Sequence, residues 1–207
     1  MRLLAVSDSI SPVIYSANFP GNLPPFDLTL AAGDLSGDFL EFLASRTVTP
    51  PIYVHGNHAL GYVREGDHGR RKPGGCIDAH LQIVEMAGLR ILGVEGSARY
   101  REGPHQYGER QFAAMLARLA PRLWLLERRF GRAVDVLLTH APPLGPHALS
   151  DHAHRGIPAF NAFHRRWRPR LHVHGHVHLS GANAARSYQS PEGVKVVNAF
   201  EFTLIEL

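Results

Sequence analysis

The sequence predicts one α/β domain that spans residues 1–207. Short apolar runs, typical of buried strands, alternate along the chain with segments of helical periodicity. Several of these runs stop abruptly at a polar cluster. No internal repeat, low-complexity tract or linker divides the sequence. We therefore expect one core, with polar side chains gathered at the carboxyl ends of its strands.

The composition narrows the class of protein. The chain is 44% apolar and 19% charged, an ordinary globular balance, and no stretch has the length of a membrane span. The first apolar run is too short for a signal-peptide core. Cys76 is the only cysteine, so an internal disulfide is impossible and we expect a cytoplasmic location. The net charge of +4 suits an anionic substrate without indicating nucleic-acid binding.

The first half of the chain has the pattern strand, helix, strand. We expect strands at residues 2–7, 27–32 and 51–55, and a helix at residues 36–45 with Ser36 as its cap. The strands end at Asp8, at Gly33-Asp34 and at Gly56-Asn57-His58. Residues 61–75 are rich in Gly, Arg and charge, and we expect a loop there.

The second half begins with a predicted hairpin of residues 81–85 and 89–94. A helix is expected over residues 109–130, with Pro121 as a possible break, and a short one over residues 160–167. Strands at residues 134–139 and 171–174 lead into His140 and into Gly175-His176-Val177-His178. Residues 183–189, 194–198 and 201–207 are expected to close this half as antiparallel strands.

The polar clusters at the strand ends combine carboxylates, one amide and imidazoles. This mixture suits Mn²⁺, Fe or Zn²⁺ better than Ca²⁺ or Mg²⁺, which prefer oxygen ligands. Each cluster alone is weak, because Gly-Asp and Gly-Asn are common turn dipeptides and a lone histidine is more often a core residue. The prediction of a metal site depends on all five clusters in this order.

The same clusters carry a resemblance to a known family. The order Asp8, Gly33-Asp34, Gly56-Asn57-His58, His140, Gly175-His176-Val177-His178 closely resembles the calcineurin-like metallophosphoesterase superfamily. The resemblance covers nearly the whole chain and includes residues 135–143 and 197–199. Within the superfamily the chain looks most similar to compact prokaryotic members that lack the histidine of the Asp-x-His motif.

The resemblance implies a four-layer αββα sandwich of two mixed β-sheets flanked by helices, with two divalent metal ions, Mn²⁺ or Fe first and Zn²⁺ next. It implies that Asp34 bridges both metals. Asp8 and His178 would complete the first site, and Asn57, His140 and His176 the second. His58 would face the substrate as a catalytic residue.

This ligand set fits phosphoester hydrolysis. Two divalent ions about 3.5–4 Å apart can share a bridging hydroxide, which attacks phosphorus in an in-line displacement. With two carboxylates, the centre keeps a net charge of about +1, which attracts a phosphate. His58 can protonate the leaving alkoxide.

The sequence departs from the family pattern near the first metal. Ile10 stands where the family usually has a ligand histidine, and Gly37 stands where purple acid phosphatases supply a tyrosine instead. We therefore expect the first site to bind metal weakly. Ala59 replaces a frequent acidic residue after Gly-Asn-His, and Asp38 is one residue out of step with the carboxylate that often orients the catalytic histidine.

Further residues are candidates for substrate contacts. His154 and Arg155, in the loop after His140, are predicted to bind the substrate phosphate, since arginine suits bidentate phosphate recognition. Arg99 and Tyr107, in the loop near residues 98–108, are further candidates. His55 and His174 each precede a motif glycine, and a packing role is favoured for both.

The function expected is hydrolysis of a phosphodiester or phosphomonoester, with a small-molecule phosphoester as substrate. A nuclease is the alternative among enzymes, although the moderate charge argues against it. A non-catalytic scaffold on the same fold is the alternative from another class, and Ile10 and Ala59 leave it open. The sequence leaves the oligomeric state undetermined.

Overall fold

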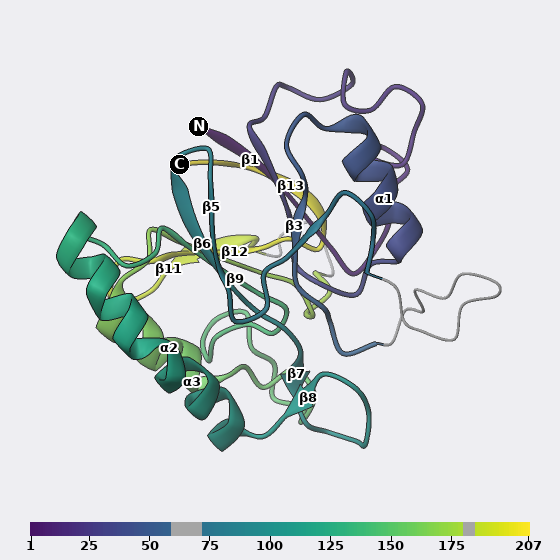
Figure 1. Cartoon of the computed structure of the whole chain (residues 1–207). Helices are drawn as coiled ribbons and strands as arrows, with labels where there is room; N and C mark the ends of the chain where they lie inside the picture. Colours follow the sequence, from purple (N-terminus) through teal and green to yellow (C-terminus); the bar gives the residue numbers. More distant parts are fainter. Residues whose placement is uncertain (59–71, 180–184) are drawn as a thin grey trace.

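The computed structural model describes residues 1–58, 72–179 and 185–207. Two β-sheets face each other, with helices on their outer sides, and the two termini lie close together (Figure 1). The first sheet contains β1 (Arg2–Ser7), β2 (Leu28–Ala31), β3 (Ile52–Tyr53), β4 (Ile77–Asp78) and β13 (Glu201–Glu206). The second contains β5 (Ile83–Met86), β6 (Leu89–Val94), β9 (Val136–Thr139), β10 (Leu171–His174), β11 (Ser187–Gln189) and β12 (Lys195–Asn198). The remaining elements are α1 (Gly37–Arg46), α2 (Glu109–Phe130), α3 (Pro158–Trp167), β7 (Ser97–Ala98) and β8 (Gln106–Tyr107).

Successive side chains of each strand point to opposite faces of the sheet, so each strand contributes to two layers of the core. In β1, Leu3 and Ala5 enter the core between the sheets, whereas Leu4 and Val6 pack in the cluster that includes residues of α1. In β9, Leu137 joins the cluster beneath α2 and α3. Both faces of these strands are buried, which explains their continuous apolar runs. The predicted αββα sandwich is confirmed.

Two of the helices follow their sequence signals closely. The Ser36 hydroxyl accepts a hydrogen bond from the Phe39 amide at 3.3 Å, as expected for the cap of α1. Helix α2 continues through Pro121, so the break considered there does not occur. Pro121 and Ala117 are both exposed, so water can satisfy the carbonyl that lacks its helical partner. No helix in the described residues is long and apolar enough to cross a membrane.

The strands near the C-terminus correct one prediction. Strand β12 pairs parallel to β10, and only β11 is antiparallel to it. Strand β13 crosses to the other sheet and pairs antiparallel with β1. Glu201, with φ 59°, turns the chain between the sheets, and the buried Val196 and Val197 mark β12 as an interior strand. Some predictions fall outside the described residues. They concern Ala59, residues 61–71 of the expected loop, and residues 183 and 184 of the expected strand.

Two buried histidines form a hydrogen-bonded chain between α3 and β10: His164 lies on α3 and His172 on β10. Thr139 Oγ1 donates to the Ala141 carbonyl at 2.6 Å and therefore accepts from His172 Nε2 at 2.8 Å. His172 Nδ1 must then accept from His164 Nε2, also at 2.8 Å. Each ring in this chain is neutral. Burial lowers the pKa of His164 to about 4 and that of His172 well below its usual value.

This histidine chain makes stability depend on pH. Unfolding returns both rings to water, where their pKa is about 6.5, so the unfolded state binds more protons below that pH. The free energy of unfolding should therefore fall as pH drops from about 6.5 to about 4. His164→Gln keeps a donor for His172 and removes one titrating group. It should flatten the slope by up to about 1.4 kcal/mol per pH unit.

Urea unfolding between pH 7.5 and 4.5 measures this slope. His152→Gln is the matched control, because His152 is exposed in the folded state as well. Equal slopes for wild type and His164→Gln would contradict the neutral chain.

Candidate metal centre

The predicted ligands lie where strands of the two sheets end side by side. Asp8 follows β1, Asp34 follows β2, and Asn57 and His58 follow β3; His140 follows β9, and His176 and His178 follow β10. The strands β1, β2 and β3 run parallel in one sheet, and β9 and β10 run parallel in the other. Their carboxyl ends therefore present the side chains at one edge of the sandwich.

Glycines in the motifs let these loops approach one another. A Cβ atom on Gly56 would overlap the Asp34 carboxylate, and one on Gly175 would overlap the Ser7 hydroxyl and lie 2.5 Å from Asp8 Oδ2. A Cβ atom on Gly33 would lie 2.5 Å from Nδ1 of His140. The glycine in each motif is thus required by the space that the neighbouring ligand occupies.

Three ligand residues adopt a left-handed backbone that side chains rarely take. Asp8, Asp34 and His176 have φ values of 64°, 52° and 66°. Such conformations cost of order 1–3 kcal/mol each and cluster at functional sites. The sharp turn at the end of each strand directs the side chain out of the sheet and toward the others.

His140 lies fully buried at the middle of the cluster. Its Nδ1 donates a hydrogen bond to the Ala32 carbonyl oxygen at 2.8 Å, so Nε2 is the nitrogen that faces the cluster. This Nε2 lies 2.9 Å from Asn57 Oδ1 and 3.4 Å from Asp34 Oδ2. The two acceptor oxygens favour positive charge at Nε2, which a proton or, in its place, a bound metal ion can supply.

The two aspartates and His140 form the metal-compatible group of the described residues. One ligand atom each from Asp8, Asp34 and His140 lies within 4.8 Å of the others. Oxygen and imidazole donors in this ratio fit a divalent transition metal, so the residues present suit the metal ions that the motif implies.

The charges of this group depend on one another. Burial would raise the pKa of Asp8 and of Asp34, but both are lowered by the imidazoles beside them, above all His178 for Asp8 and His140 for Asp34. Burial would lower the pKa of His140, but the two carboxylates raise it. The site therefore keeps both carboxylates ionised and attracts positive charge.

The two histidines after β10 differ in their surroundings. Nε2 of His176 contacts the Ala153 carbonyl at 2.9 Å, which leaves Nδ1 with the free lone pair, and burial lowers its pKa to about 4. His176 also donates its backbone N–H to Asp8 Oδ2 at 2.9 Å. His178 is exposed, its ring stacks on Phe200, and its Nε2 lies 3.7 Å from Asp8 Oδ1.

His58 lies at the rim of the cluster. Its backbone N–H donates to Asp34 Oδ1 at 2.9 Å, and its Nε2 lies 3.7 Å from Asp34 Oδ2. The side chain is 54% exposed, so it remains accessible to a substrate. Asp38 lies in the first turn of α1.

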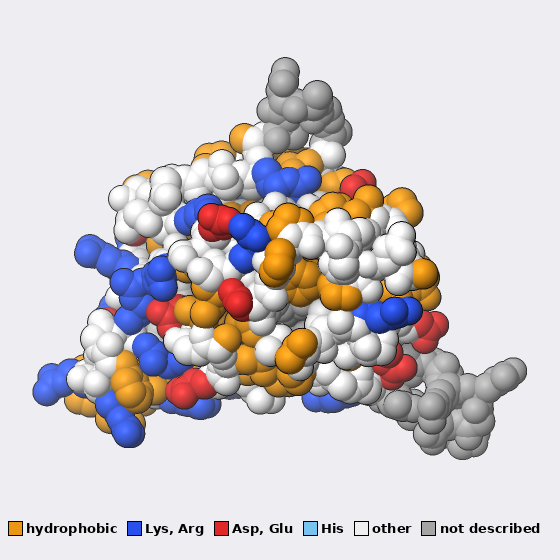
Figure 2. Space-filling view, turned by 90° about the horizontal axis from the view of Figure 1, so that it is seen from above, with side chains coloured by type: hydrophobic (Ala, Val, Ile, Leu, Met, Phe, Trp, Pro, Cys, Tyr) orange, Lys and Arg blue, Asp and Glu red, His pale blue; other side chains and the backbone are white. Residues whose placement is uncertain are grey.

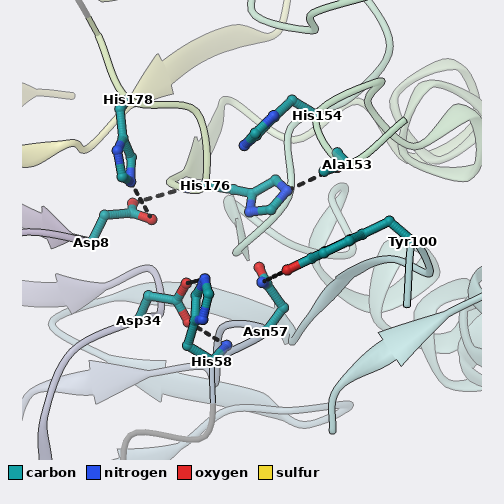
Figure 3. Close-up of a pocket in the computed structure, with 9 residues that line it drawn as sticks. All are labelled: Asp8, Asp34, Asn57, His58, Tyr100, Ala153, His154, His176 and His178. Atoms are coloured by element: carbon teal, nitrogen blue, oxygen red, sulfur yellow. Dashed lines mark hydrogen bonds and ion pairs between the residues drawn. The ribbon is translucent and has the colours of Figure 1, made fainter. Parts of the chain in front are cut away.

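A cavity of about 350 Å³ opens over the cluster (Figure 3). It is lined by the ligands Asp8, Asp34, Asn57, His176 and His178, and by His58, Tyr100, Ala153 and His154. Figure 3 shows the side chains of these motif residues directed into a common space, with Asp8 and His178 on one side and Asp34 and His58 on another.

The two predicted substrate-binding residues have different positions. His154 lines the cavity, and Asp151 Oδ1 holds its Nδ1 at 2.8 Å. Arg155 is not among the lining residues, and its Nη2 lies 3.5 Å from Glu109 Oε1. The packing roles favoured for His55 and His174 agree with their contacts: His55 stacks on His105, and His174 Nε2 lies 2.7 Å from His147 Nδ1.

Sequence reasoning missed Tyr100. It singled out Arg99 and Tyr107 in the same loop, but Arg99 contacts Gln106 and Gln111 whereas Tyr107 contacts Glu95. Tyr100 lines the cavity and its hydroxyl accepts a hydrogen bond from Asn57 Nδ2 at 3.0 Å. No periodic signal distinguishes these three residues in a loop, since their directions depend on the loop's own hydrogen bonds.

Position 10 adds no candidate ligand to the predicted first metal site. The Ile10 side chain is 40% exposed and is not among the residues that line the cavity. Gly37 is buried at the start of α1. Asp8, Asp34 and His178 are thus the ligand candidates for the first metal.

Comparison with known proteins shows the family and the fold of this chain. The sequence pattern of the calcineurin-like phosphoesterase family matches residues 2–180, and the chain belongs to this family. The crystal structure of TT1561 of Thermus thermophilus is similar over 97% of this chain and 89% of its own, with a TM-score of 0.57 and 14% identity. Another crystal structure is similar over 99% of this chain and 94% of its own, with a TM-score of 0.61 and 13% identity. These likenesses show the fold, and no curated protein matches the chain.

Replacement of Gly56 tests the close approach of the loops. In Gly56→Ala the new Cβ atom must displace the Asp34 carboxylate, so metal binding should be lost. Wild type should gain about 2.7 kcal/mol of stability at a Mn²⁺ concentration 100 times its Kd, and Gly56→Ala should gain almost none. Thermal unfolding with and without Mn²⁺ measures the difference.

Gly108→Ala is the control, because its Cβ atom would lie at an ordinary 3.5 Å from Gln111 Oε1. Full stabilisation of Gly56→Ala by Mn²⁺ would show that the motif glycine does not shape the centre.

Proposed function

We propose that this protein is a metal-dependent hydrolase of phosphate esters. Membership of the calcineurin-like phosphoesterase family supports metal-dependent phosphoester hydrolysis as the reaction class. The observation that carries the proposal is the convergence of Asp8, Asp34 and His140 from three separate strand ends, with Nε2 of His140 facing oxygen atoms of Asn57 and Asp34.

The proposed ligand assignment follows the motif. Asp8, Asp34 and His178 would hold one divalent ion, and Asp34, Asn57, His140 and His176 the other. Mn²⁺ or Fe is favoured and Zn²⁺ is the next choice, because carboxylate, amide and imidazole donors accept all three. Such ions, when bound, supply Lewis acidity and activate water at neutral pH.

The protein's own groups then orient the substrate and handle the proton. The carbonyl oxygens of Ala32 and Ala153 fix which nitrogens of His140 and His176 face the centre. To the exposed ring of His58, which lies beside Asp34, we assign the transfer of a proton to the leaving alkoxide. His154, oriented by Asp151, is our candidate for contact with the phosphate. Such a role for Arg155 stays an untested prediction.

The cavity favours a small phosphoester. A volume of about 350 Å³ is near the lower end for small-molecule sites. Figure 2 shows one face of the molecule, on which Lys and Arg gather toward the side of α2 and α3 and are interspersed with Asp and Glu elsewhere. The modest net charge of +4 gives the chain little basic excess, which argues against a nuclease. We place the enzyme in the cytoplasm, in keeping with its single cysteine.

A panel of phosphomonoesters and phosphodiesters, assayed with each metal added to stripped protein, tests the function. Wild type should turn over several of them. Asp34→Asn should lower turnover by more than about 100-fold, since it removes several kcal/mol of stabilisation through the metals. Asp38→Asn is the control on the exposed side of α1 and should keep its activity. A scaffold without activity would show no metal-dependent turnover in wild type.

The leaving group provides a separate test of His58. Aryl phosphoesters, whose leaving groups need little protonation, should be hydrolysed faster than alkyl phosphoesters. His58→Gln should slow alkyl substrates by about 10²–10⁴-fold and aryl substrates much less. Equal rates of wild type on both kinds of ester would contradict this role.

The ligand count at the two sites predicts unequal metal affinities. Titration of stripped protein with Mn²⁺ should show one tight and one weak class of site, because Ile10 supplies no ligand to the first. His178→Ala should remove the weak class and His140→Gln the tight one. Two tightly held ions in protein purified without chelators would count against this assignment.

A further inference from the structure

Tyr100 makes a direct contact with a residue of the proposed second metal site. It lies between β7 and β8, and its phenol ring lines the cavity (Figure 3). Its hydroxyl oxygen is 3.0 Å from Asn57 Nδ2, and the opposite atom of that amide, Oδ1, is 2.9 Å from His140 Nε2. The Tyr100 hydroxyl therefore accepts a hydrogen bond from the NH₂ group of Asn57, which is directed away from the centre.

This contact selects one of two amide orientations. An asparagine amide presents an oxygen acceptor on one side and an NH₂ donor on the other. A metal ion can be bound only through Oδ1. By accepting from Nδ2, the Tyr100 hydroxyl keeps Oδ1 directed at the centre.

The same hydroxyl keeps a proton to donate. A phenol that accepts a hydrogen bond through its oxygen still has its own O–H. Because the ring lines the cavity, this O–H can reach a group bound there. In a cavity bordered by metal ligands, an anionic phosphoryl oxygen is the acceptor that fits such a donor.

The loop that carries Tyr100 is rigidly supported from below. The buried Gln106 side chain accepts hydrogen bonds from the backbone N–H groups of Tyr100 and Arg101 at 3.3 and 3.2 Å. This support fixes the phenol before a substrate arrives.

We propose that Tyr100 is a positioning and substrate-binding residue, which holds the Asn57 amide in its ligating orientation and donates its hydroxyl proton to a phosphoryl oxygen of the bound ester. The inference rests on the proposed function. Tyr100 is not part of the family motif and is not proposed as a metal ligand. Its hydroxyl is a neutral hydrogen-bond donor beside the proposed second metal site.

Two dissociation constants test the inference without requiring turnover. One is that of Mn²⁺ for stripped protein, followed by electron paramagnetic resonance. The other is that of inorganic phosphate for protein saturated with Mn²⁺, followed by calorimetry. Tyr100→Phe should weaken phosphate binding by about tenfold or more, the usual effect of losing a hydrogen bond to a charged group. It should also weaken the tighter class of Mn²⁺ binding.

Tyr107→Phe is the matched control, because it removes a phenol hydroxyl of the adjoining strand β8, and this hydroxyl contacts Glu95 instead of Asn57. Its two constants should remain within twofold of wild type. The proposal is overturned if either constant of Tyr100→Phe stays within twofold of wild type, or if Tyr107→Phe reproduces its losses.

The binding measurements separate this inference from the proposed function. Wild type that hydrolyses phosphoesters, with an unchanged Tyr100→Phe variant, would overturn the role of Tyr100 alone. Wild type that binds Mn²⁺ and phosphate in a Tyr100-dependent way without hydrolysing any ester would support the role of Tyr100 and overturn the proposed function.

Discussion

The Asp34 carboxylate links the ends of the two sheets. One of its oxygens accepts the backbone N–H of His58 from the loop after β3, and the other lies 3.4 Å from His140 Nε2, after β9. Gly56 leaves room for it, and its own backbone is in the left-handed region. The Asp34 carboxylate is therefore the contact that the loops after β2, β3 and β9 share.

Much of this arrangement is predictable from the sequence because the fold and the site use the same signals. An apolar strand that ends at a polar cluster specifies both a buried strand and a side chain at the sheet edge. The strands β1, β9 and β10 were predicted on these grounds and the cap Ser36 from the helical spacing after it, and the structure confirms them. The parallel pairing of β12 was not predicted. The direction of pairing depends on a distant partner, β10, and no local pattern in the sequence encodes it.

Loop side chains were the least predictable part of the site. Tyr100 and Arg155 show why. The direction of Tyr100 is set by the side chain of Gln106, six residues away, and Arg155 is drawn toward Glu109 at the start of α2. The phosphate contact predicted for Arg155 stays untested, and its guanidinium has an acidic partner, Glu109, 3.5 Å away in another element. Such competition becomes visible only when the elements are placed in space.

The fold of this chain is shared with structures of very different sequence, whereas its proposed chemistry depends on a few residues at the strand ends. At 13% and 14% identity the two crystal structures share the fold with this chain. We propose that the few residues at the strand ends carry the chemistry. Ile10 shows that even this set varies, and the consequence should appear in the affinity of one metal site while the other ligands remain in place.

The central claim is that Asp34 lies between metal ions held by loops from both sheets. The most direct test is a crystal structure of the protein grown with Mn²⁺, with anomalous diffraction data collected at the manganese absorption edge. Bound Mn²⁺ should give anomalous density on both sides of the Asp34 carboxylate, and this density should be stronger on the side of His140 than on the side of Asp8. An ordered cavity without anomalous density beside Asp34 would contradict it.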